Sequence, residues 1–303
     1  MSAAAPSGGL RTRSASPGRD LTRPPAPEPL PVALYDNHTH LEFEDGVDQL
    51  DPIESLERAA AVGVRGVVQV GTDLETSRWG ARLAATDARV LAAVALHPNE
   101  APKLAAKGLL DEHLRRIAAL AAEPRVRAIG ETGLDFFRTG EDGRAAQARS
   151  FEVHIEIAKE HGLALQIHDR DAHDEVVATL LRVGAPESTV FHCFSGDAAL
   201  ARICNDHGWY LSFAGTMTFK NAPDLREALA VADPSRVLVE TDAPFLTPEP
   251  LRGRPNAPYL LPHTVRRMAE VLGDPLEELC VRLAVNTERV YGQWSPETET
   301  VSP

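Results

Sequence analysis

The chain has 303 residues, 43% of them hydrophobic and 25% charged, and its 44 acidic and 31 basic side chains give a net charge of −13. This composition excludes a wholly disordered chain, and the length suits one large α/β domain or two small ones. No apolar stretch approaches the roughly 20 residues that cross a bilayer. The acidity argues against a wide nucleic-acid-binding surface. It does not argue against a small site where metal ions supply the positive charge. The three cysteines form no CxxC pair, and we expect free thiols in a reducing, cytoplasmic setting at Cys193, Cys204 and Cys280.

Both ends of the chain differ in composition from its middle. Residues 1–30 are dominated by Pro, Ala, Ser, Gly and Arg, which predicts a disordered tail. Residues 1–19 contain arginines and no acid, as organellar transit peptides do, but Pro and Gly interrupt any amphipathic helix there. Residues 295–303 form a second short polar tail, so the predicted domain covers residues 31–294.

Short apolar runs alternate with longer helical patterns through the middle of the chain. The expected strands are 33–38, 65–71, 89–96, 126–131, 163–168, 188–192, 209–213 and 236–241. The expected helices are 52–62, 73–86, 109–122, 144–161, 172–183, 197–207, 221–231, 262–272 and 275–291. Such alternation over about 260 residues predicts an α/β fold, a TIM (β/α)8 barrel. An open doubly wound sheet is the alternative, but no GxGxxG follows the first strand and no GxxxxGK[ST] occurs.

Side chains that bind metals occur where the predicted strands end. The first strand ends in Asp36, His38 and His40, which share one side because side chains alternate along a strand. Two imidazoles at positions i and i+2 can bind one ion, although an ordinary polar pair has the same pattern. In a barrel these strand ends converge on the face that holds active sites, which favours the metal interpretation.

Four later strands end in similar residues. Glu131 follows an apolar strand, where a buried carboxylate needs a positively charged partner. That partner is either a metal ion, an arginine or a helix N-terminus. His168 and His192 end the fifth and sixth strands, and each taken alone is typical of a core histidine. Glu240 and Asp242 share one side of the eighth strand, where an isolated acidic pair usually forms a salt bridge or a cap.

Taken together, these residues are hard to explain as separate structural features. Histidines and carboxylates at several strand ends of one barrel predict two divalent ions, bridged by a carboxylate when they lie about 3.5–4 Å apart. Imidazole and carboxylate ligands without thiolate suit Zn²⁺, Mn²⁺ or Mg²⁺ and do not choose among them.

Other candidates lie near the same strand ends. His97 ends the third strand and could support a ligand or contact substrate. Arg170 follows His168 and could hold an anionic group or form a surface ion pair. Phe136 and Phe137, on the loop after Glu131, could stack on a base or pack as a hydrophobic lid. The remaining histidines are expected to be structural: His113, His154, His161, His173, His207 and His263.

The order of the motifs resembles the TatD-like metal-dependent deoxyribonucleases. The resemblance covers nearly all of residues 33–292 and rests on these segments in order: DNHTHL (36–41), LHP (96–98), IGETGLDFF (129–137), IHDRDA (167–172), FHCFSG (191–196), ETDAPFLTP (240–248) and RGRPNAP (252–258). It implies a TIM barrel of the metal-dependent hydrolase type, in agreement with the alternation of strands and helices.

The resemblance also implies a role for each site residue. His38 and His40 match the ligands of one metal, and His168 and His192 match those of the second. Glu131 matches the ligand shared between them. Asp242 matches the acidic residue beside the first metal that handles the proton of the nucleophile, so Asp242 and Glu131 are the expected catalytic residues. Glu240, Arg252 and Asn256 match family positions with supporting roles. Asp36, His97 and Arg170 are further supporting candidates because of their places at the strand ends.

The sequence departs from the family pattern away from the expected ligands. His154 stands where many members have Gln, and Phe137 stands where many have Tyr. The loss of the tyrosine hydroxyl bears on substrate preference. The leading segment 1–30 also lies outside the family pattern.

The expected activity is hydrolysis of phosphodiester bonds at single-stranded DNA ends, with a metal-activated water whose proton passes to Asp242. An ester or amide hydrolase, such as a D-aminoacyl-tRNA deacylase, is the alternative within metal-dependent hydrolysis. A non-catalytic barrel scaffold is the alternative of another class. The scaffold predicts loss of at least one ligand, whereas every expected ligand is present.

Overall fold

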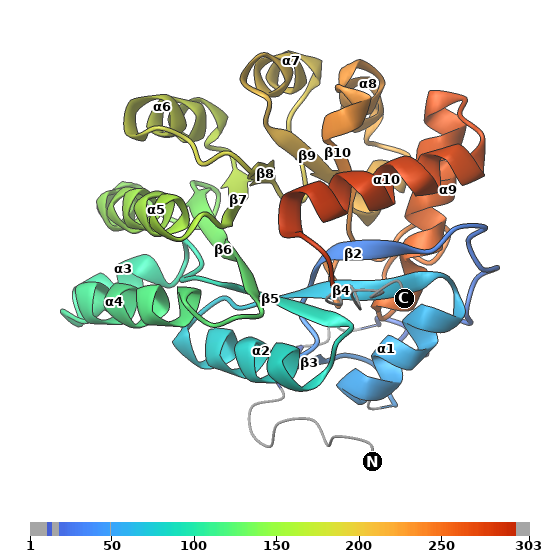
Figure 1. Ribbon diagram of the computed structural model, residues 1–303, viewed down its shortest axis with the longest axis horizontal. Helices are drawn as coiled ribbons and strands as arrows, with labels where there is room; N and C mark the ends of the chain where they lie inside the picture. The colour runs from blue at the N-terminus through green and yellow to red at the C-terminus, as the bar shows by residue number, and fades with distance from the viewer. Residues whose placement is uncertain (1–10, 14–17, 49, 295–303) are drawn as a thin grey trace, which may run out of the picture.

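Eight parallel strands form the centre of the molecule, and each pairs with its neighbours in chain order (Figure 1). The computed structural model describes residues 11–13, 18–48 and 50–294. The strands are β2 (Leu34–Thr39), β4 (Val64–Val70), β5 (Val90–Val94), β6 (Val126–Asp135), β7 (Ala164–Arg170), β8 (Thr189–Phe191), β9 (Tyr210–Phe213) and β10 (Val237–Val239). Helices lie outside the ring, so the predicted TIM barrel is confirmed.

The barrel closes between its first and last strands. Asp242 N donates to His38 O at 2.9 Å, and His40 N donates to Ala243 O at 2.8 Å. A parallel bridge joins Thr39 to Ala243 at the same place. The closing contacts therefore lie at the carboxyl ends of the strands, among the residues that the sequence marks as a site.

Helices connect successive strands and cover the barrel. They are α1 (Pro52–Ala61), α2 (Leu74–Thr86), α3 (Ala101–Ala106), α4 (Leu110–Ala121), α5 (Glu141–His161), α6 (His173–Val183), α7 (Ala198–His207), α8 (Pro223–Val231), α9 (Leu261–Leu272) and α10 (Leu276–Tyr291). Local chemistry sets their ends: Asp73 caps α2 in a capping box with Thr76, and Gly162 ends α5 in the left-handed conformation. In the described part of the chain, no helix has the length and apolarity to span a membrane.

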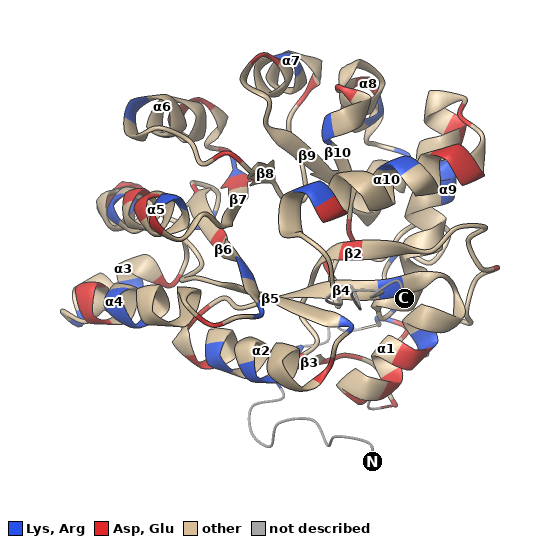
Figure 2. Ribbon diagram, viewed as in Figure 1, with Lys and Arg blue, Asp and Glu red and all other residues tan. Residues whose placement is uncertain are grey.

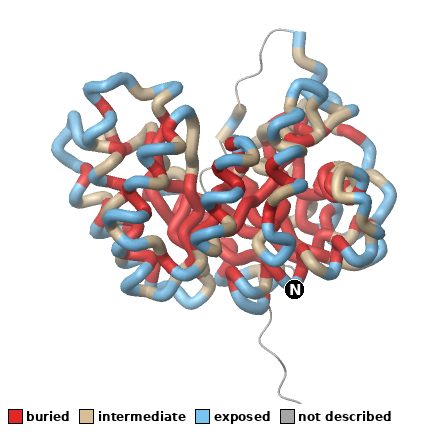
Figure 3. The backbone as a smooth tube through the Cα atoms, turned by 90° about the horizontal axis from the view of Figure 1, so that it is seen from above, coloured by how far each residue is buried: buried red, intermediate tan, exposed pale blue. Residues whose placement is uncertain are grey.

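Burial follows the two layers of the barrel. Every residue of β5 is buried, because a parallel strand in a barrel is covered on one side by helices and filled on the other by side chains. Buried residues collect in the centre of the molecule and exposed ones on the outer helices (Figure 3). Figure 2 shows both signs of charge interspersed over those helices.

The expected elements all occur, with shifts of a few residues at their ends. Helix α3 was not expected, because its six residues are too few to show a helical period. Strand β6 runs to Asp135 rather than ending at Glu131. The expected tails fall partly outside the described residues, at 1–10, 14–17 and 295–303.

Residues 18–30 differ from the expected disordered tail, because they lie along the barrel with specific contacts. The Tyr259 hydroxyl donates to Pro24 O at 2.7 Å, and Arg266 donates to Glu28 O at 3.0 Å. Farther toward the N-terminus, β1 (Arg11–Thr12) pairs in parallel with β3 (Phe43–Glu44). Composition could not reveal these contacts, because they use the backbone carbonyls of proline and glutamate, and every residue offers a carbonyl.

Candidate metal centre

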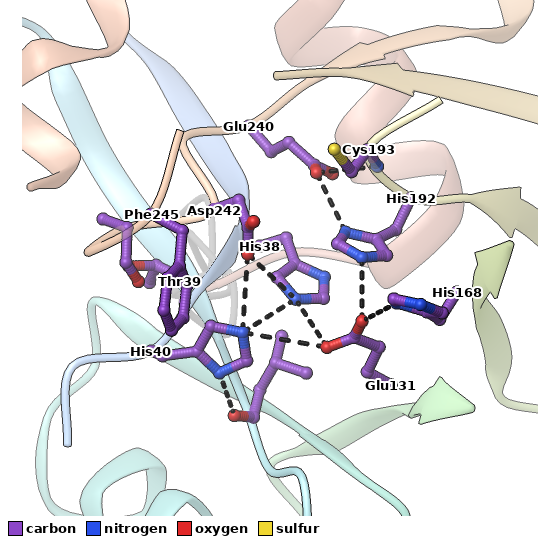
Figure 4. Close-up of polar contacts among 12 residues, drawn as sticks. His38, Thr39, His40, Glu131, His168, His192, Cys193, Glu240, Asp242 and Phe245 are labelled. Carbon is purple, nitrogen blue, oxygen red and sulfur yellow. Dashed lines mark hydrogen bonds and ion pairs between the residues drawn. The ribbon is translucent and has the colours of Figure 1, made fainter. Parts of the chain in front are cut away.

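The carboxyl end of the barrel collects the expected metal-binding side chains in one cluster (Figure 4). They come from five strands, β2, β6, β7, β8 and β10, or from the residues that directly follow them. The cluster consists of His38, His40, Glu131, His168, His192 and Asp242. Strand alternation and the convergence of parallel strand ends together place these side chains on the same face.

One side of the cluster is formed by His38, His40 and Asp242. The Nε2 atoms of the two histidines lie 3.2 Å apart. Asp242 Oδ1 lies 3.9 Å from His38 Nε2 and 3.5 Å from His40 Nε2. Asp242 has a φ of 51°, a left-handed conformation that Asp adopts more readily than most residues and that turns the chain sharply after β10. Three ligand atoms therefore face a common point.

Glu131 is the centre of the other side. Its Oε1 lies 2.5 Å from His168 Nδ1, 3.1 Å from His192 Nε2 and 3.3 Å from His97 Nε2. Its Oε2 lies 3.7 Å from His38 Nε2 and so faces the first group. The two carboxylate oxygens of Glu131 therefore point toward different halves of the cluster.

Outer oxygens orient two of the imidazoles by hydrogen bonds, and a third oxygen approaches His168. His40 Nδ1 lies 2.9 Å from Val70 O, His192 Nδ1 lies 2.9 Å from Glu240 Oε1, and His168 Nε2 lies 3.3 Å from Asp135 Oδ2. An oxygen that accepts one ring N–H leaves the other nitrogen free to act as an inward ligand, as in most metal-binding histidines. This arrangement fixes both the tautomer and the ring orientation.

Electrostatics keeps Glu131 charged. Burial alone raises its pKa, but His97 and His192, with hydrogen bonds from His168 and His192, lower the pKa well below its ordinary value. Burial and the neighbouring His192 lower the pKa of His38, whereas, despite burial, the neighbouring carboxylates raise the pKa of His40 to about 9 and that of His192 well above its ordinary value.

The donor set fits divalent cations. Three groups of ligand atoms lie within 4.8 Å of one another: His38–Glu131–His192, His38–His40–Asp242 and His97–Glu131–His168. Buried carboxylates at this density repel one another unless cations lie between them. Imidazole nitrogen and carboxylate oxygen suit Zn²⁺, Mn²⁺ and similar ions.

Some expected supporting residues hold the site in place without facing the cluster. Asp36 accepts hydrogen bonds from Thr241 N at 2.9 Å and from the Thr241 hydroxyl at 2.5 Å, which ties β2 to the end of β10. The Asn256 amide donates to Thr241 O at 3.0 Å and to Phe245 O at 2.5 Å. Both residues thereby fix the backbone around Asp242.

The two expected arginines lie outside the ligand cluster. The Arg170 guanidinium lies 3.9 Å from the ring centroid of Phe137, a side chain that is 62% exposed. The Arg252 guanidinium lies 4.1 Å from the ring centroid of Phe219. Within the described residues, neither arginine forms the carboxylate pair that was the alternative for Arg170. Each forms a cation–π pair instead.

Asp135 was not selected from the sequence. Its carboxylate faces His168, and its pKa falls below the ordinary value because hydrogen bonds from His168 and Asn99 outweigh its burial. Strand β6 continues to this residue, so alternation from Glu131 through Gly133 to Asp135 was a usable signal. The Val70 carbonyl gives no signal of this kind, because every residue has one.

Known proteins resemble this chain over most of its length. A family model described as TatD related DNase matches residues 35–292. An uncharacterized metal-dependent hydrolase TatD of Mycobacterium tuberculosis is 47% identical over 264 residues, which cover 86% of this chain and 98% of that protein. A protein of Citrobacter rodentium named 3'-5' ssDNA/RNA exonuclease TatD is 34% identical over 248 residues, covering 80% of this chain and 92% of that protein.

A solved structure has the same fold. The crystal structure of YJJV, a TatD homolog from Escherichia coli K12, superposes with a TM-score of 0.76 at 27% identity and covers 87% of this chain and 98% of that one. The sequence motifs, the barrel, the family model and these relatives agree. The chain belongs to the TatD-related DNase family of metal-dependent hydrolases.

Proposed function

We propose that this hydrolase is a deoxyribonuclease that removes nucleotides from single-stranded ends with two divalent ions. The observation that carries the proposal is the gathering of four imidazoles around Glu131 and Asp242 at the carboxyl end of the barrel. The family match and the relative named as a single-strand exonuclease support it.

The two halves of the cluster are the proposed ion sites. One ion would be held by His38, His40 and Asp242, and the other by His168 and His192. Glu131 would be shared, since its two oxygens face different halves. Ions bound there lower the pKa of a water and offset the charge that grows on the phosphoryl oxygens.

Asp242 is the proposed proton acceptor. Its side chain is 13% exposed, against 7% for Glu131, so it is the cluster carboxylate more open to an entering water. Its Oδ1 lies beside the facing imidazoles of His38 and His40, and the turn after β10 holds it there. A carboxylate so positioned takes the proton as the water attacks phosphorus.

Aromatic and cationic side chains near the strand ends suit a single strand. Phe137 follows β6 and carries Arg170 against its ring, which offers a base a stacking surface with a nearby positive charge. The net charge of −13 disfavours a long duplex, whose binding needs many phosphate contacts. A short single-stranded end needs few.

The test is a substrate panel on the full chain with Zn²⁺, Mn²⁺ or Mg²⁺. We expect stepwise shortening of a labelled linear single strand, slow attack on the matching blunt duplex and no attack on a circular single strand. No nucleotide release with any ion would contradict the proposal, and cleavage of the circle would indicate an endonuclease. D-aminoacyl-tRNA in the same panel distinguishes the deacylase alternative, which predicts amino-acid release without nucleotide release.

Asp242→Asn separates proton transfer from folding in this assay. We expect kcat to fall by about 10²- to 10³-fold with a small change in KM, because the isosteric amide cannot accept the proton. Asp206→Asn is the matched control, since it removes the same charge from an exposed position on α7. Equal activity in the two variants would remove Asp242 from the mechanism.

A further inference from the structure

The segment that precedes the family domain lies beside the metal centre. The family model begins at residue 35, whereas β1 is Arg11–Thr12. Arg11 N donates to Glu42 O at 2.6 Å, and Arg13 N donates to Glu44 O at 2.9 Å. These carbonyls belong to the turn and strand that directly follow His40, so the pairing carries Arg13 to the edge of the site.

The Arg13 side chain is directed to the loop that follows Asp242. Its Nη1 donates to Pro244 O at 2.6 Å, and its guanidinium lies 4.9 Å from the ring centroid of Phe245. The Phe245 ring in turn lies 6.0 Å from the ring of His40, beside which Figure 4 draws it. A single aromatic ring therefore separates the Arg13 guanidinium from an expected metal ligand.

The charge of Arg13 is only partly matched by a local carboxylate. Arg19 already takes both oxygens of Asp45, at 2.6 and 2.5 Å, while Arg13 approaches one of them at 3.3 Å. One carboxylate cannot neutralise two guanidinium groups, which stay protonated at any ordinary pH. The side chain of Arg13 is 28% exposed and that of Arg19 is 9% exposed, so Arg13 is the one open to a ligand.

We propose that Arg13 binds a phosphate of the substrate strand, next to the phosphate that is cleaved. The inference rests on the proposed nuclease function and adds a residue from outside the family domain. Both hydrogen bonds of the Arg13 guanidinium within the described residues, to Pro244 O and to Asp45 Oδ2, come from Nη1. Its other nitrogens can donate to a phosphate oxygen, and arginine suits that geometry. Its position over the Asp242 loop orients the strand toward the cluster.

The test measures binding and turnover of a labelled oligothymidylate by the full chain with Mn²⁺. Binding is measured in an Asp242→Asn background, in which we expect cleavage to be about 10²- to 10³-fold slower. There Arg13→Ala should raise Kd about tenfold. The plot of log Kd against log salt concentration should become shallower by about 0.7, the slope for one phosphate contact on a single strand. Arg13→Lys should give a Kd and a salt slope between those of Arg13→Ala and of the chain with Arg13 intact. Arg116→Ala, on α4 and paired with Glu112, is the matched control and should change neither quantity.

Turnover measurements distinguish the proposed role of Arg13 from the proposed nuclease function. With Asp242 intact, Arg13→Ala should raise KM for the oligonucleotide and leave hydrolysis of bis(p-nitrophenyl) phosphate unchanged, since that ester has no neighbouring phosphate. The wild type could cleave the strand while Arg13→Ala and Arg116→Ala show equal Kd values and equal salt slopes. That result would overturn the role of Arg13 and leave the nuclease function standing. A wild-type chain that neither binds nor cleaves the strand would overturn the nuclease function, and this inference with it.

Discussion

His154 shows how a buried imidazole can serve the fold and not the metal centre. Its Nδ1 donates to Ser150 O at 2.7 Å, and its Nε2 accepts from Leu96 N at 3.2 Å. Both ring nitrogens are thus used, and burial lowers the pKa of His154 to about 4. The contrast with His192, whose Nε2 faces a carboxylate of the cluster, separates a structural histidine from a candidate ligand.

His154 makes stability depend on pH in a defined direction. The unfolded imidazole gains its proton near its ordinary pKa of 6.5 and the folded one near 4, so its contribution is complete above about pH 6.5 and is lost as the pH falls toward 4. Between about pH 7.5 and about pH 5, the wild type should lose about 2 kcal/mol more of unfolding free energy than His154→Gln. Urea unfolding of both proteins in EDTA at each pH measures this. A parallel decrease in the two proteins would show that His154 does not titrate as inferred.

At the scale of single elements, strand contacts set the positions of the ligands. Gly133 pairs with His168 across β6 and β7. A Cβ at Gly133, where φ is +132°, would lie 2.2 Å from His168 O. The close approach of the two strands therefore depends on a residue without a side chain, and it helps to hold Glu131 against His168.

Gly133→Ala should destabilise the chain by about 2–4 kcal/mol, because the methyl group clashes with a fixed backbone and strains the left-handed conformation. It should also reduce metal binding, since the clash displaces His168. Gly273→Ala, at the end of α9, is the control: its φ is +70° and its Cβ meets nothing within 4 Å. That variant should cost about 1 kcal/mol through backbone strain alone. Unfolding titrations and bound-metal analysis compare the two variants. Equal losses of stability and of bound metal in both would contradict the role of strand packing.

Elements also show what could be predicted from the sequence. Alternation and strand ends indicated that His38, His40 and Asp242 share a face, because these rules are local and the barrel repeats them. The contacts of Arg13 could not be predicted, since they join residues far apart in the chain through a carbonyl and a ring. Helix α3 was missed for a different reason, its shortness.

On the scale of the whole molecule, the candidate metal centre joins side chains from the first and last strands of the sheet. His38 belongs to β2 and Asp242 follows β10, and between them lie the candidate ligands of β6, β7 and β8. Ions bound at this point would cross-link five of the eight strands of the sheet. Binding that occurs only in the closed barrel stabilises it by mass action.

Metal removal should therefore lower the melting temperature. Ions at a free concentration of about a hundred times their Kd add about 2.7 kcal/mol to the free energy of unfolding. This raises the melting temperature by about 5–10 °C for a domain of this size. Differential scanning fluorimetry of EDTA-treated protein, with and without added Zn²⁺ or Mn²⁺, measures the shift. His168→Ala should reduce it. A melting temperature indifferent to ions in the wild type would argue against a metal centre in the folded barrel.

The seam between Thr39 and Ala243 has a consequence for incomplete chains. The last candidate ligand and the hydrogen bonds that close the barrel belong to residues 242 and 243. A chain that ends before these residues lacks both Asp242 and the closing contacts. We therefore expect a chain that ends before residue 242 to be inactive as a hydrolase.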